Sequence, residues 1–61
     1  MQSISAKELT FLQDQLANEQ LMVKKYTMYA QQVGDAALKK KCKSIAQKHQ
    51  DHYDKLFKHL S

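Results

Sequence analysis

The stretch QQVGDAAL, residues 31–38, decides the fold, because it holds the one glycine of a 61-residue chain that has no proline. Gly34 can adopt a left-handed conformation after a helix without strain, and Asp35 can cap a following helix immediately. The sequence therefore predicts a turn of about two residues at this point. A turn this short places the helices before and after it side by side and antiparallel.

The segment before the turn has the start signal and the periodicity of one long helix. The residues Ser5-Ala6-Lys7-Glu8 form a capping box, and Ile4 and Leu9 flank it as a hydrophobic staple. Apolar residues then follow at alternating spacings of three and four once position 19 is included: Leu9, Leu12, Leu16, Val23, Tyr26, Ala30 and Val33. We expect a helix over about residues 6–33.

The segment after the turn repeats this pattern and predicts a second helix over about residues 36–60. Its stripe consists of Leu38, Cys42, Ile45, His49, His52, Leu56 and then His59 or Leu60. Further apolar side chains widen both stripes: Phe11, Met22, Tyr29, Ala46, Tyr53 and Phe57. A wide stripe predicts more than one partner helix, and a monomer of this size buries little surface. We therefore expect one all-α domain over residues 1–61, an antiparallel two-helix hairpin that dimerises into a four-helix bundle.

Three ionisable residues interrupt these stripes, Glu19 in the first and His49 and His52 in the second. If the turn is centred between Gly34 and Asp35, Glu19 lies in the layer of His49, with His52 one turn away on the same face. A carboxylate inside a bundle costs several kcal/mol unless it is paired. Either the histidines bind it in a triad, or all three residues bind a divalent metal, for which zinc, iron and manganese are candidates.

This arrangement resembles the half-repeat of ferritin-like bundles, in which one helix carries Glu and the next carries two ligands at i and i+3. Within that superfamily, Leu12 to Leu60 is most similar to the small spore coat F-like proteins. The similarity is carried by Asp14-x-Leu16-x-x-Glu19, Lys25-Tyr26, Leu38-Lys39 and Gln47-x-His49-x-x-x-Tyr53. The resemblance implies a ferritin-like fold, a place in the spore coat and coat proteins as partners, but no reaction. His49 stands where the ferritin-like motif has Glu, and a set richer in imidazole favours zinc, copper or nickel over iron.

Composition narrows the cellular setting and the partners. A lone cysteine, Cys42, suits a reducing compartment, and no apolar run reaches the roughly 18 residues of a membrane span, so we expect a cytoplasmic protein without membrane contact. The net charge of +4 comes from lysine alone. Without the bidentate arginine fork, sequence-specific nucleic-acid binding is disfavoured. Four of the lysines form a basic run whose role the sequence does not define: Lys39, Lys40, Lys41 and Lys43.

These observations favour a homodimeric structural or interaction protein with a divalent-metal site at Glu19, His49 and His52. Two alternatives stay open at this point, a small metal-dependent redox or storage protein and a nucleic-acid-associated protein that uses its lysines. The sequence shows neither a phosphate-binding glycine loop nor an H-E-x-x-H motif. It therefore favours a non-enzymatic role.

Overall fold

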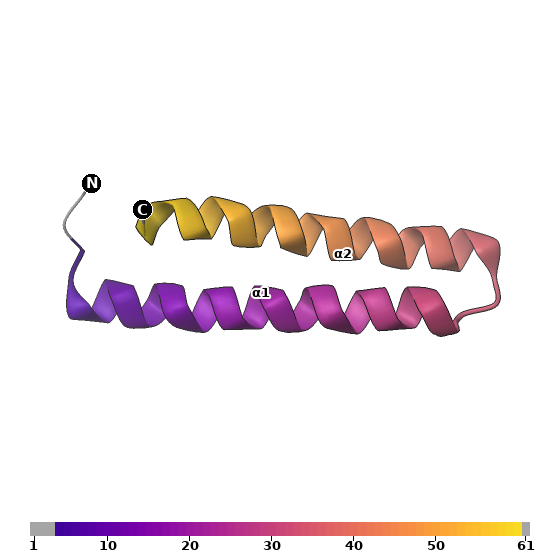
Figure 1. The fold of residues 1–61 in the computed structure, drawn as a ribbon, viewed down its shortest axis with the longest axis horizontal. Helices are drawn as coiled ribbons and strands as arrows, with labels where there is room; N and C mark the ends of the chain where they lie inside the picture. Colours follow the sequence, from indigo (N-terminus) through magenta and orange to yellow (C-terminus); the bar gives the residue numbers. More distant parts are fainter. Residues whose placement is uncertain (1–3, 61) are drawn as a thin grey trace.

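The chain folds into an antiparallel hairpin of two long helices. The computed structural model describes residues 4–60, in which α1 spans Ala6–Gln32, α2 spans Ala36–Phe57 and the short 3₁₀ helix η1 spans Lys58–Leu60. The two helices lie side by side along their length, so that the start of α1 and the end of η1 share one end of a rod of 47 × 16 × 10 Å (Figure 1). The predicted all-α hairpin is confirmed, and residues 4–60 contain no strand.

Both predicted helix starts are confirmed. The Ser5 hydroxyl accepts a hydrogen bond from the Glu8 N–H at 3.1 Å, and the Glu8 carboxylate accepts one from the Ser5 N–H at 3.0 Å. Asp35 caps α2 by accepting from the Leu38 N–H at 2.7 Å. Each cap satisfies backbone donors that a helix leaves unpaired at its first turn.

The turn differs from the prediction, because Gly34 has no left-handed conformation. The chain leaves α1 at Gln32 through Val33, which is extended at φ −78° and ψ 140° and donates its N–H to the Tyr29 carbonyl at 3.0 Å. The connection is therefore Val33–Asp35, three residues in extended or turn geometry. The chain reverses over these three residues without any left-handed residue.

The side chain of Lys39 also closes the end of α1. Its Nζ donates a hydrogen bond of 2.7 Å to the carbonyl of Ala30, one of the last carbonyls of the helix. The positive charge complements the dipole of α1. This lysine of the basic run therefore serves the fold, a role that the sequence did not suggest.

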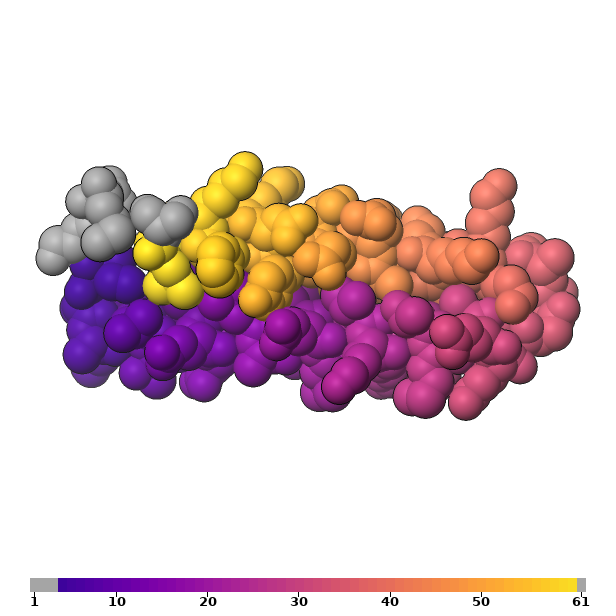
Figure 2. Space-filling model, in the orientation of Figure 1, coloured from indigo at the N-terminus to yellow at the C-terminus, as the bar shows by residue number. Residues whose placement is uncertain are grey.

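The core is a narrow seam between α1 and α2, along which the two helices are in contact (Figure 2). Five apolar residues are buried in it: Leu12, Leu16, Ala30, Cys42 and Ala46. Ala46, expected at the edge of the stripe, is buried, whereas Leu38, expected in its centre, is 50% exposed. Two helices can enclose only the residues directly between them, so the wider apolar stripe stays open.

Candidate metal centre

The structure brings the three polar intruders of the seam together near its middle. Nδ1 of His49 lies 2.5 Å from Oε1 of Glu19, and Nδ1 of His52 lies 3.5 Å from Oε2 of the same carboxylate. Glu19 is contributed by the centre of α1, and the histidines lie one turn apart on α2. The antiparallel register that the short turn imposes thus places residues 30 positions apart in one layer. We call these three residues the triad.

The triad changes from buried to open across its width. The Glu19 side chain is 13% exposed, that of His49 is 26% exposed and that of His52 is 56% exposed. The carboxylate therefore lies between the helices, with one imidazole beside it and the other at the edge of the seam. The triad is therefore most open to solvent on the side of His52.

The donor atoms are close enough to share a cation. One ligand atom from each of Glu19, His49 and His52 can be chosen so that all lie within 4.8 Å of one another. In a tetrahedral zinc site with bonds of about 2.0–2.1 Å, neighbouring donors are roughly 3.3 Å apart. The present separations bracket that value, so side-chain rotations would suffice to form such a site. Without a cation, the hydrogen bond from His49 to Glu19 satisfies the carboxylate instead.

Aromatic rings cover the inner histidine. The Tyr26 ring stacks on the His49 ring with centroids 6.1 Å apart and planes at 13°, and Tyr29 meets Tyr26 edge-on at 5.6 Å. The His52 ring meets the His49 ring edge-on at 5.8 Å. His49 is therefore held between Tyr26, His52 and the carboxylate, and these contacts restrict the orientation of its ring.

Tyr26 was not expected at this site, because a turn centred between Gly34 and Asp35 sets its backbone near Cys42 of α2, well over a turn from His49. Side chains in a helix lean toward its N-terminus. In an antiparallel pair, Tyr26 on α1 leans away from the turn and His49 on α2 leans toward it. The two rings therefore meet although their backbone positions are about a turn and a half apart along the hairpin.

One side of the hairpin carries the open edge of the triad together with six apolar residues that are at least partly exposed. At 100° per residue, Phe11, Met22 and Tyr29 lie on one flank of α1, the flank on which Tyr29 contacts Tyr26. On α2 the residues that share the flank of His52 are Leu38, Ile45 and Leu56. We call this side the triad face, and all six of its apolar residues are intermediate or exposed. The opposite side presents the polar residues Thr27, Lys43, Gln47 and Gln50 beside Val23 and Ala46.

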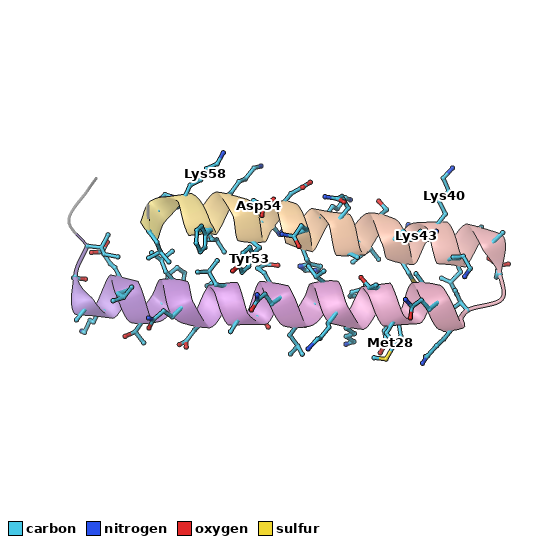
Figure 3. All side chains as sticks on the ribbon, viewed as in Figure 1. Met28, Lys40, Lys43, Tyr53, Asp54 and Lys58 are labelled. Atoms are coloured by element: carbon cyan, nitrogen blue, oxygen red, sulfur yellow. The ribbon has the colours of Figure 1, made fainter. Side chains whose placement is uncertain are left out.

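The other titratable residues that the sequence singled out do not join the triad. His59 lies in η1 and is exposed, and Cys42 is a buried free thiol in the core. Lys40 points away from α1 (Figure 3), while Lys41 and Lys43 are exposed on α2. Neither long helix within residues 4–60 combines the length and apolarity needed to cross a bilayer.

Comparison with known proteins identifies a relative of undescribed function. The chain is 39% identical over 57 residues to a protein of Bacillus subtilis (strain 168) called uncharacterized protein YuzM, in an alignment that covers 93% of this chain and 70% of the relative. No family model matches the sequence, and no solved structure matches the fold. The ferritin-like and spore coat F-like resemblance therefore stays a prediction.

Proposed function

We propose a metal-binding structural role for this chain, which belongs to the same family as the uncharacterized protein YuzM of Bacillus subtilis (strain 168). One observation carries the proposal: a carboxylate and two imidazoles, from two different helices, present donor atoms within 4.8 Å of one another. They take three seam positions at which the periodicity of the helices calls for apolar side chains.

The donor set favours a borderline cation. One carboxylate and two imidazoles are the ligands of many zinc sites that keep a fourth position open. Nitrogen-rich sets bind zinc, copper and nickel in preference to magnesium or calcium, which select oxygen ligands. Among the expected metals, zinc fits three protein ligands with a fourth position open, and iron(II) fits as well, because two histidines and one carboxylate are also the ligands of non-haem iron sites. A metal held by the triad would be most accessible from the side of His52, the most exposed member of the triad.

The triad face supplies a surface for a second hairpin. Its apolar residues lie on both helices around the triad, and their burial against a second copy would reinforce a seam that buries few residues on its own. A twofold pairing across this face would bring two Glu and four His together inside a four-helix bundle. We propose this homodimer as the working form. A location in the cytoplasm is proposed from the single cysteine, and the spore coat, with coat proteins as partners, is proposed from the sequence resemblance alone.

The metal proposal is tested by titrating the purified protein with zinc in a calorimeter, which measures the affinity. A second titration uses Co²⁺, whose visible spectrum reports its ligands. Glu19→Gln, His49→Ala and His52→Ala are each expected to weaken zinc binding at least tenfold, because each removes one of three protein ligands. His59→Ala is the matched control, since it deletes an exposed imidazole outside the triad. Equal affinity in wild type and in the combined triad variant, or equal losses in the control, would contradict the site.

The dimer is tested separately through the exposed apolar residues of the triad face. Phe11 and Leu38 are 58% and 50% exposed, so Phe11→Gln/Leu38→Gln should leave the hairpin folded. We expect this variant to shift the mass measured by light scattering toward the monomer. A wild-type protein that stays monomeric and well folded in the micromolar range would refute the dimer. This result would leave the metal proposal unaffected.

A further inference from the structure

A second apolar stripe runs along α1 on the side that faces away from α2. Ala17, Leu21 and Met28 are exposed, the last two at 59% and 49%. At 100° per residue they lie within about 40° of one another and about 100–180° from the seam residues Leu16 and Ala30. Met28 points away from α2 (Figure 3). These residues line one part of an open groove of about 890 Å³, which continues past Val23 to Gln50 of α2.

The spacing of this stripe is that of a coiled-coil seam. Its residues follow at alternating distances of three and four: Asp14, Ala17, Leu21, Lys24 and Met28. This is the a and d pattern, which positions side chains to interdigitate with another helix. The hairpin does not use it, because α2 packs on the other side of α1. We call these five residues the outer seam of α1.

We propose that the outer seam binds the outer seam of a second copy of this chain, with the two α1 helices antiparallel. With the twofold axis at the level of residue 19, Asp14 of each copy lies opposite Lys24 of the other, and Ala17 lies opposite Leu21. Acidic residues thus meet basic ones twice, and a small side chain meets a large one twice. Both kinds of complementarity come from one register of one helix.

Other arrangements of the same helices lose this complementarity. A parallel pairing in register sets Asp14 against Asp14 and Lys24 against Lys24, which is repulsive. Shifting the antiparallel pair by one heptad sets Leu21 against Lys24 in one direction and Lys24 against Lys7 in the other. The seam therefore specifies its own orientation and register.

The outer seam and the triad face lie on different sides of α1, so both can be occupied at once. A chain with two different twofold interfaces is not limited to a dimer and can continue into larger assemblies. The outer seam itself does not depend on the triad or on metal. With three apolar residues from each copy, it belongs to the small and reversible class of interfaces.

Charge exchange tests this interface in sedimentation equilibrium, over a concentration series that reaches the millimolar range. Asp14→Lys and Lys24→Asp each create two repulsive contacts, and each should weaken association at least tenfold. The double variant Asp14→Lys/Lys24→Asp restores both attractive contacts and should associate like wild type. Asp51→Lys, an exposed charge reversal on α2, is the matched control and should change little. A double variant as weak as the single ones, or single variants equal to the control, would overturn the proposal.

Two further measurements separate this interface from the metal site and from the triad face. The charge series is repeated in the Phe11→Gln/Leu38→Gln background, where the remaining association is that of the outer seam. The second measurement is disulfide cross-linking in Cys42→Ala protein, in which chains carrying Ala17→Cys are mixed with chains carrying Leu21→Cys. The mixed disulfide should form in larger amount than the disulfide of either chain with itself. If Ala17→Cys homodimers dominate instead, the helices pair in parallel and the proposed interface is wrong. Zinc affinity should be unchanged in the charge variants. If the protein binds no zinc at the triad but the double charge variant still associates like wild type, only the metal proposal is contradicted.

Discussion

The triad layer and the layers next to it are built on the same two helices, but their side chains differ in how far they are buried. Leu16 lies one turn before Glu19 on α1, and Ala46 lies one turn before His49 on α2. Leu16 and Ala46 are each 8% exposed, whereas the triad opens progressively toward His52. Equivalent positions in one seam therefore give a closed apolar layer or an open polar one, according to the residue that occupies them. The apolar layers hold the helices together, and the triad depends on them for its geometry.

The largest effect is expected where the closed layers are broken. Leu16→Ala should lower the free energy of unfolding by about 2–5 kcal/mol, because it removes buried methyl groups from a small core and leaves a cavity. Leu21→Ala deletes the same atoms from an exposed position and should change the stability of dilute protein by about 0.5 kcal/mol or less. Urea unfolding followed by circular dichroism measures both variants. Similar costs at the two positions would mean that the seam does not carry the fold.

A smaller effect, of opposite sign, is expected when the triad layer is made apolar. Without metal, Glu19→Leu/His49→Leu should be at least as stable as wild type, by up to about 1 kcal/mol, because replacing a desolvated polar pair with packed side chains is often stabilising. Glu19→Leu alone should be less stable than the double variant, since it leaves His49 without its carboxylate. The measurement is urea unfolding in a chelator. A double variant clearly less stable than wild type would show that the triad supports the fold rather than function.

Those parts of the structure that depend on local chemistry and periodicity could be predicted from sequence. Ser5, Glu8 and Asp35 have the spacing and side chains of helix caps, and all three form them. Glu19 and His49 could be paired because a short turn between two uninterrupted helices leaves little freedom of register. That the three residues bind metal is a prediction of their chemistry, which the fold permits.

The missed features depend on side-chain reach and on how each helix is rotated about its axis. Periodicity defines the face of a helix only broadly, so it could not show that Ala46 would be enclosed and Leu38 left exposed. The register of backbones likewise did not predict that Tyr26 would reach the ring of His49. Lys39 contacts a carbonyl nine residues earlier, across the turn, a contact that no local pattern encodes.

The smallest effect is expected far from the triad, at the capping box of α1. Hydrogen bonds from the backbone and side chain of Ser5 lower the pKa of Glu8 below its ordinary value. A carboxyl group with a lowered pKa stabilises the folded state above its unfolded pKa of about 4.3, and this contribution is lost as the pH falls through the folded value. Glu8→Gln removes the charge, so its urea midpoint should lie slightly below that of wild type at pH 7. The difference should shrink as the pH falls below the unfolded pKa of about 4.3 and disappear once the pH lies below the lowered pKa of Glu8 in the folded state, where both side chains are neutral. A difference that persists unchanged in acid would instead assign the effect of the substitution to side-chain geometry and not to charge at the start of the helix.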